Sequence, residues 1–140
     1  MDEVILYIDG AALPNPGHGG AGVVLMTHIH GRTHKRAFGV YMGENVTNNA
    51  AEIFAAIAGL TTLKRSCVVN VLTDSQYLVG TMTKNWARRA NTELWNMLDM
   101  AVSRHEVTWQ WVKGHAGDPH NELAHEFAER AALERKDVTE

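Results

Sequence analysis

Cysteine is almost absent from this sequence. Cys67 stands alone among 140 residues, which excludes an internal disulfide framework and a cysteine-based zinc site. We expect Cys67 to be a small buried hydrophobe in a protein of a reducing compartment. Long apolar runs are missing too, and no stretch approaches the ~20 residues of a membrane span. The acidic start, Met1-Asp2-Glu3, is unlike a signal peptide. These absences predict a cytoplasmic protein.

An excess of positive charge is also lacking. Lys and Arg number 13 against 16 Asp and Glu, a net charge of -3, whereas nucleic-acid binders usually carry a basic balance. The acidic residues are concentrated after Gly114, and basic clusters remain at residues 32–36 and 84–89. A local basic patch is therefore compatible with the sequence, and bound metal ions would offset clustered acids.

The hydrophobic patterns predict a mixed α/β fold with the order β-β-β-α-β-α-α-β-α. Strands are expected at residues 4–8, 21–26, 35–42, 68–73 and 107–112. Helices are expected after Thr47, over 76–82, over 93–104 and from Asp118 to about Leu133. The Gly/Pro-rich segment 10–22 is typical of a loop. We expect a five-stranded sheet, three antiparallel strands followed by parallel crossovers, flanked by helices. Residues 1–140 form one domain with a flexible tail at about 135–140.

Carboxylates stand where the predicted elements end. Asp9 closes an apolar strand, and a lone carboxylate removed from water costs several kcal/mol unless it is paired. If the fourth strand pairs parallel with the first, Asp74 lies beside Asp9 at the strand ends where open α/β sheets bind ligands. Glu52 comes from the crossover helix. Three carboxylates so close favour hard divalent ions, which can activate water for phosphodiester hydrolysis. The simpler alternatives are a helix N-cap for Asp74 and a solvated Glu52.

Four segments carry a resemblance to a known family. They are Tyr7-Ile8-Asp9-Gly10, Thr47-Asn48-Asn49-Ala50-Ala51-Glu52, Leu72-Thr73-Asp74-Ser75-Gln76-Tyr77, and the twelve residues from Trp111 to Glu122, WVKGHAGDPHNE. Together they resemble the motifs of type 1 ribonuclease H, in that family's order and spacing, and the resemblance covers nearly the whole chain. Each segment alone would be weak, but four in order are highly specific.

The resemblance implies an endoribonuclease that hydrolyses the RNA strand of RNA–DNA hybrids with two divalent ions, Mg²⁺ or Mn²⁺, leaving 5′-phosphate products. It implies that Asp9, Glu52 and Asp74 are metal ligands. It also implies that His115, on a glycine-flanked turn, assists proton transfer or product departure. A monomer with no obligatory protein partner and no membrane attachment is the default expectation.

The resemblance further implies contacts to the hybrid. The candidate substrate-binding residues are Gly10, Asn15, Thr47, Asn48, Gln76 and Asn91. For Thr47, a purely capping role stays open. Many bacterial members carry a long basic handle after the third acidic motif, whereas only Arg88 and Arg89 remain of it here. Because fewer phosphate contacts weaken hybrid binding and its dependence on salt, we expect a weaker binder than relatives with the handle.

Besides the short handle, the sequence departs from the family at a second place. The fourth catalytic acid of the family is an Asp in the last helix. It aligns with His125, which is neutral or cationic where the family has an anion. As a nitrogen ligand, His125 would suit Mn²⁺ or Zn²⁺ better than Mg²⁺. Alternatively, His125 only solvates that face of the helix and the fourth ligand is dispensable. Glu122 or Glu129 could supply part of the missing charge.

Two other functions compete with the endonuclease. One is a non-catalytic or weakly active module that binds RNA–DNA hybrids, with its active site altered at His125. The other is a different chemistry on the same sheet, such as a DNA exonuclease or recombinase. The intact set of Asp9, Glu52 and Asp74 argues for the enzyme, since decay rarely spares every essential ligand.

Overall fold

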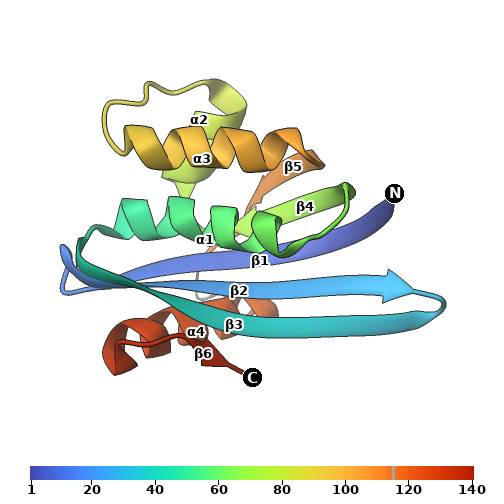
Figure 1. The fold of residues 1–140 in the computed structure, drawn as a ribbon, viewed down its shortest axis with the longest axis horizontal. Helices are drawn as coiled ribbons and strands as arrows, with labels where there is room; N and C mark the ends of the chain where they lie inside the picture. The colour runs from blue at the N-terminus through green and yellow to red at the C-terminus, as the bar shows by residue number, and fades with distance from the viewer. Residues whose placement is uncertain (115) are drawn as a thin grey trace.

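The computed structural model describes residues 1–114 and 116–140. Within them, six strands form one sheet in the order β5-β4-β1-β2-β3-β6, and four helices pack around it (Figure 1). The strands are β1 (Asp2–Leu13), β2 (Gly17–Ile29), β3 (Arg32–Val46), β4 (Cys67–Thr73), β5 (Glu106–Trp111) and β6 (Val138–Thr139). The helices are α1 (Asn48–Thr62), α2 (Gln76–Lys84), α3 (Thr92–Ser103) and α4 (Pro119–Glu134). In this described part, no helix has the length and apolar character needed to cross a membrane.

The sheet is mixed, as the sequence predicts. β1, β2 and β3 form an antiparallel meander, and β4 and β5 follow parallel to β1. Two details of the prediction need correction. The sheet has a sixth strand, β6, where five were expected, and segment 10–22 is mostly strand rather than loop. β1 continues to Leu13 and β2 begins at Gly17, so the turn between them spans only residues 14–16.

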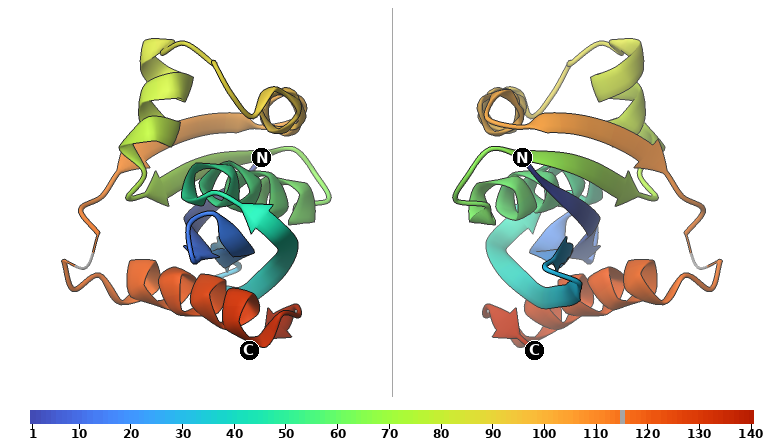
Figure 2. Two further views of the ribbon diagram at one scale, coloured as in Figure 1. Left: turned by 90° about the vertical axis from the view of Figure 1, so that its left-hand side faces the viewer. Right: turned by 90° about the vertical axis from the view of Figure 1, so that its right-hand side faces the viewer.

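The two faces of the sheet are covered differently (Figure 2). α1 packs on β1 and β2, and α3 contacts both α1 and β5, so these two helices share one face of the sheet. α4 lies alone across β1, β2 and β3 on the opposite face. The main core fills the α1 side, where Trp95, Leu6 and Ile8 of β1, and Val69 and Val71 of β4 are almost fully buried. This arrangement places β1 between α1 on one face and α4 on the other.

Glycines in β2 and β3 allow α4 to approach the sheet closely. A Cβ placed on Gly22 would lie 1.8 Å from the carbonyl oxygen of Ala124. At Gly20 and Gly39 it would lie 2.1 and 2.4 Å from carbonyl oxygens farther along the helix. Such distances leave no room for a side chain, so the helix backbone packs directly on the strands. Two of these glycines belong to segment 10–22, which reads as a loop because glycine is also the typical turn residue.

The helix starts agree with the sequence at two places and differ at one. Thr47 caps α1 by accepting a hydrogen bond from the Ala50 N–H, and Asp118 caps α4. α2 is capped by Ser75, whose Oγ accepts from the Leu78 N–H at 3.1 Å. The cap position of α2 is therefore not Asp74. The carboxylate of Asp74 instead belongs to the end of β4.

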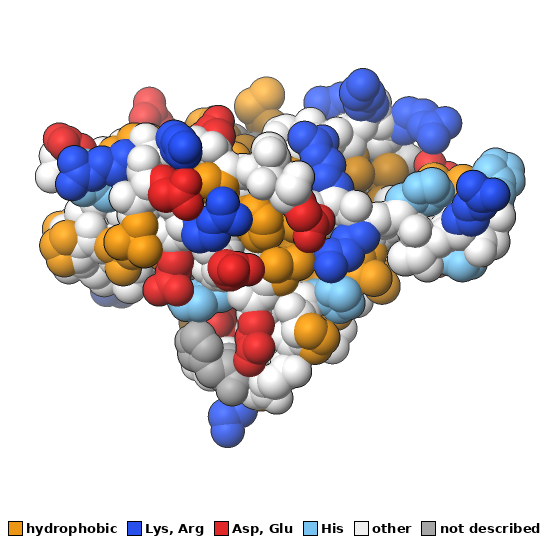
Figure 3. All heavy atoms as spheres, turned by 90° about the horizontal axis from the view of Figure 1, so that it is seen from below, with side chains coloured by type: hydrophobic (Ala, Val, Ile, Leu, Met, Phe, Trp, Pro, Cys, Tyr) orange, Lys and Arg blue, Asp and Glu red, His pale blue; other side chains and the backbone are white. Residues whose placement is uncertain are grey.

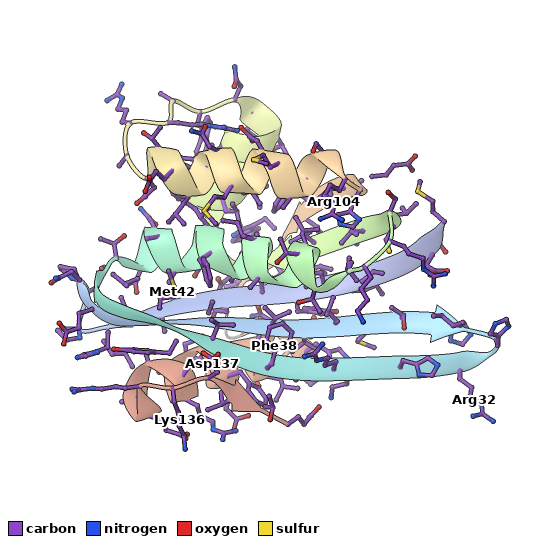
Figure 4. All side chains as sticks on the ribbon, viewed as in Figure 1. Arg32, Phe38, Met42, Arg104, Lys136 and Asp137 are labelled. Carbon is purple, nitrogen blue, oxygen red and sulfur yellow. The ribbon has the colours of Figure 1, made fainter. Side chains whose placement is uncertain are left out.

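The C-terminal segment, expected to be a flexible tail over about 135–140, packs on the sheet edge instead. Val138 is buried and pairs with Gly39 in β6. Asp137 lies beside β3, where its carboxylate accepts a hydrogen bond from the Tyr41 N–H at 2.9 Å (Figure 4). The edge of β3 offers unpaired backbone groups to any extended segment that reaches it, which explains why so short a strand forms.

Replacing Gly22 by Ala tests the close approach of α4. The new methyl group must displace either the helix or the strand, and we expect a loss of unfolding free energy on the order of 3 kcal/mol. Thermal or urea unfolding measures it. Gly31→Ala is the control, because Gly31 has a positive φ of 76° but open space around it. Its cost should be about 1 kcal/mol. A Gly22→Ala protein no less stable than Gly31→Ala would contradict the packing argument.

Candidate metal centre and active site

Three carboxylates converge at the ends of β1 and β4. The parallel pairing of these strands ends at Tyr7 and Leu72, and Asp9 and Asp74 each lie two residues farther along. Glu52 reaches the same place from the first turns of α1. Oxygen atoms of the three carboxylates all lie within 4.8 Å of one another. The structure therefore brings together the three acids that the sequence singles out.

The position of Glu52 depends on a second close approach. A Cβ on Gly10 would lie 2.5 Å from the backbone of Ala51 and Glu52, so α1 also packs directly on β1. The sequence predicts a substrate contact for Gly10. In the structure, Gly10 lets the start of α1 come near Asp9, and its backbone hydrogen bond lowers the pKa of Glu52.

The effects that raise the pKa of Glu52 are stronger than this hydrogen bond, which lowers it. Burial raises its pKa well above the ordinary value, and the neighbouring charge of Asp9, a hydrogen bond with Asp9 and the charge of Asp74 raise it further. Asp9 and Glu52 are 3% and 8% exposed. The Oε2 atom of Glu52 is buried and has no hydrogen-bond partner among the described residues. A buried, unpaired carboxylate oxygen beside two further carboxylates fits a hard divalent cation, which satisfies the oxygen and offsets the repulsion.

His125 enters this cluster from α4. Its Nδ1 lies 2.6 Å from Oδ2 of Asp9, and its Nε2 lies 3.2 Å from Oε1 of Glu129. The hydrogen bond with Asp9 is the main cause that raises the pKa of His125, and the charges of Asp9, Glu129 and Asp74 add to it against the effect of burial. The same side chains line a hollow of about 330 Å³. His125 thus faces the carboxylates instead of only solvating the outer face of α4.

The proposed proton-transfer residue, His115, lies outside the described residues. Its neighbour Gly114 lies against Asp74, because a Cβ there would be 2.6 Å from Oδ2 of that carboxylate. After the turn, Asp118 raises the pKa of Tyr7 through its charge and a hydrogen bond, with burial as the larger cause. This contact links the start of α4 to β1, two residues before Asp9.

Asn15 and Asn48 connect the β1–β2 turn to the start of α1. The Asn48 side chain accepts a hydrogen bond from the Ala12 N–H at 2.9 Å, and the Asn48 N–H donates to Oδ1 of Asn15 at 3.1 Å. Asn48 also lines the hollow that contains the carboxylates. The structure therefore places Asn48 in the hollow with the carboxylates and Asn15 against the backbone of Asn48.

Thr47 and Asn91 meet across a second hollow of about 380 Å³. Arg89 and Tyr77 line it as well. The structure thus joins two residues that are 44 positions apart and that the resemblance names as candidate contacts to the hybrid. Thr47 also caps α1, so its two proposed roles are compatible.

The structure separates the two remaining residues of the basic handle. Arg88 forms a bidentate ion pair with Asp99, at 2.6 and 3.0 Å, and its guanidinium lies over the Trp95 ring. Asp99 raises the pKa of Arg88. We therefore assign Arg88 to the anchoring of the 85–91 loop, whereas Arg89 lines the hollow with Thr47.

Two exposed tryptophans were not among the candidates from the sequence. Trp86 and Trp111 are 45% and 44% exposed, and with Gln76 and Lys84 they line a hollow beside the active site. The Trp111 indole donates a hydrogen bond to the backbone carbonyl of Asp74. Alternation along β5 could have identified Trp111 as outward-facing. The place of Trp86 depends on the left-handed Asn85 after α2, which no sequence pattern indicated.

The raised pKa of Glu52 makes a prediction for the metal-free protein. A folded pKa above the unfolded value means that the stability from this group is present below about pH 4.3 and lost as the pH rises through the folded pKa. Glu52→Gln removes this loss. At pH 8 in EDTA we expect the variant to be more stable on the order of 1 kcal/mol, or roughly 4 °C in Tm.

The control is Glu126→Gln, since Glu126 is exposed and lies beyond the first turn of α4. Its Tm should match that of the unmodified protein. Added Mn²⁺ or Mg²⁺ should raise the Tm of the unmodified protein more than that of Glu52→Gln. A lower Tm for Glu52→Gln at pH 8 without metal would show that the ionised carboxylate is well accommodated.

Comparison with known proteins agrees with this geometry. A profile of the RNase H family matches residues 1–133, which include the three carboxylates. Ribonuclease HI of Pseudomonas aeruginosa strain PAO1 is 41% identical to this chain, with 95% of each protein covered. LC9-RNase H1, a type 1 RNase H with the type 2 active-site motif, matches with a TM-score of 0.85 at 29% identity, over 100% of this chain and 78% of the other. LC11-RNase H1, solved in complex with an RNA/DNA hybrid, matches with a TM-score of 0.69 at 27% identity, over 91% and 98%. The chain belongs to the ribonuclease H family.

Proposed function

We propose that this chain is an endoribonuclease that hydrolyses the RNA strand of RNA–DNA hybrids with two divalent metal ions and leaves 5′-phosphate ends. The convergence of Asp9, Glu52 and Asp74 within 4.8 Å is the observation that carries the proposal. Membership of the family supports the substrate class, as does the hybrid bound to LC11-RNase H1.

The carboxylates of Asp9, Glu52 and Asp74 would hold Mg²⁺ or Mn²⁺, with His125 as a fourth ligand. When bound, the ions activate a water molecule and stabilise the leaving oxygen. Glu52, whose pKa is raised in the metal-free site, gives up its proton as the cation binds. His115, on the glycine-flanked turn, would carry the proton to the leaving group or assist product departure.

Neutral polar groups around the site fit the hybrid. Amides such as Asn48 and Gln76 can contact 2′-hydroxyls, sugars and base edges without sequence preference. Thr47, Asn91 and Arg89 share a hollow that fits a phosphate of the DNA strand. These groups discriminate RNA from DNA by shape and by the 2′-hydroxyl, as a sequence-independent nuclease requires.

Net charge does not oppose this role. Figure 3 shows acidic and basic side chains interspersed over the face that carries α4, with blue and pale blue side chains gathered where the β2–β3 hairpin projects. The exposed basic residues of that hairpin include Arg32, Lys35 and Arg36. Metal ions at the acidic cluster remove the strongest local repulsion for a phosphate backbone.

A cleavage assay tests the proposed function. Labelled RNA–DNA hybrid, duplex DNA and duplex RNA are incubated with the protein and either Mg²⁺ or Mn²⁺. We expect internal cuts in the RNA of the hybrid only, with 5′-phosphate ends, and a loss of at least about 10³-fold in Asp9→Asn because a metal ligand becomes neutral. Cuts in duplex DNA would point to a different nuclease. Hybrid binding without any cleavage would support a non-catalytic module.

His125→Asp tests the proposed fourth ligand. A protonated imidazole cannot bind a metal, so the activity of the unmodified protein should fall as the pH drops below the pKa of His125. That pKa is raised above its ordinary value near 6.5. An aspartate stays ionised to about pH 4, so the acid limb of the rate profile should move to lower pH in the variant. Activity with Mg²⁺ relative to Mn²⁺ should rise as well, because oxygen replaces nitrogen. If both proteins share one pH profile and one metal preference, His125 is not a ligand.

A further inference from the structure

His125 has a carboxylate at each of its ring nitrogens. Nδ1 lies 2.6 Å from Asp9, inside the acidic cluster, and Nε2 lies 3.2 Å from Glu129, one turn farther along α4. The Asp9 side chain is 4% exposed, whereas that of Glu129 is 44% exposed. The ring therefore lies between a buried acid that faces the metal site and an outer acid that lies toward solvent.

A histidine binds a metal through a nitrogen that carries no proton, and its other nitrogen then carries the N–H group. The partner of that N–H decides which nitrogen is free for the metal. Metal-binding histidines commonly donate this N–H to a carboxylate, which fixes the tautomer and the orientation of the ring. Glu129 is placed to accept from Nε2–H, which leaves Nδ1 as the nitrogen that faces the cluster.

The structure favours Glu129 over the other acids of α4. Glu129 follows His125 by four residues, and side chains with this spacing lie on the same face of a helix. It lines the same hollow as Asp9, Glu52 and Asp74. Glu122 and Glu126 are exposed and do not line that hollow. Because α4 packs directly on Gly22, its backbone is held in place. The orientation of the His125 ring then depends on the torsion angles of its side chain, which a hydrogen bond can restrict.

We infer that Glu129 is a positioning residue that makes His125 a nitrogen ligand of the metal centre. This inference rests on the proposed function, because it concerns the same metal site. Glu129 acts by accepting the hydrogen bond from Nε2–H, which holds Nδ1 toward the cluster. The aspartate that the family has at this position offers oxygen atoms to the metal and needs no such partner.

Metal binding without any nucleic acid tests the inference. Mn²⁺ is titrated into metal-free full-length protein up to millimolar concentration, and bound Mn²⁺ is measured by the loss of the free-ion EPR signal. Glu129→Ala should weaken Mn²⁺ binding by about 10-fold or more, the usual cost of removing the carboxylate behind a ligating histidine. Mg²⁺ binding, measured by competition, should weaken less because nitrogen ligation matters less to Mg²⁺. Glu126→Gln is the matched control and should bind both ions as the unmodified protein does.

Two further variants separate positioning from simple charge. Glu129→Gln keeps an oxygen that can accept from Nε2–H but loses the charge, so we expect Mn²⁺ affinity within about threefold of the unmodified protein. In a His125→Ala background, Glu129→Ala should cause no additional loss of Mn²⁺ affinity. Equal weakening of Mg²⁺ and Mn²⁺, or additive losses in the double variant, would overturn the inference, because Glu129 would then act through its charge or as a direct ligand.

Nitrogen-15 NMR of the histidine rings gives a readout that a merely structural role would not change. In the unmodified protein with the diamagnetic ion Mg²⁺ bound, Nε2 of His125 should carry the proton, and Glu129→Ala should produce a mixture of tautomers. A single unchanged tautomer in the variant would contradict the inference. The cleavage assay is independent of this result. If Glu129→Ala binds Mn²⁺ normally while the unmodified protein cuts hybrid, only this inference fails. If the unmodified protein binds Mn²⁺ but cuts no hybrid, the proposed function fails instead.

Discussion

The active site of this ribonuclease H depends on two places where a helix backbone touches a strand backbone with no side chain between them. At Gly10, the start of α1 packs on β1, and at Gly22, α4 packs on β2. Asp9 precedes the first contact and pairs across the sheet with Gly22 itself. Each contact therefore delivers one partner to Asp9: Glu52 from α1 and His125 from α4. Side chains at these glycines would push both partners outward, and the acids would no longer lie within reach of one ion.

The geometry that assembles the site also brings carboxylates that repel one another close together. Glu52 is buried beside two other carboxylates, one of its oxygens is unpaired among the described residues, and its pKa is raised. None of this stabilises the fold in the absence of a cation. The large apolar core on the α1 side and the direct packing of α4 hold the acids in place against their repulsion. A bound cation would therefore relieve the repulsion among carboxylates that the fold holds together.

Much of this was predictable from the sequence. The order of strands and helices, the parallel pairing that brings Asp9 beside Asp74, and the caps at Thr47 and Asp118 follow from apolar runs and capping residues. The wrong predictions share one cause: glycines and short polar segments occur both in loops and in strands. Segment 10–22 is mostly strand, with Gly10, Gly20 and Gly22 facing helices, and residues 138–139 form a strand because the edge of β3 lies nearby. Both facts depend on contacts between distant parts of the chain, which local patterns do not contain.

The same limit explains why the role of His125 could not be decided from the sequence. Helical spacing places it on a polar flank beside Glu129, where a solvated histidine and a metal ligand look alike. The distance between α4 and the sheet makes the difference, and Gly20, Gly22 and Gly39 set that distance. Because the helix is so close, this flank of α4 faces Asp9. The tautomer and the orientation of a histidine there determine which ring nitrogen faces the cluster. On our proposal, a substitution of acid by histidine is therefore not a change of one residue: part of the ligand's function passes to the next turn of the helix, where Glu129 lies 3.2 Å from Nε2 of His125.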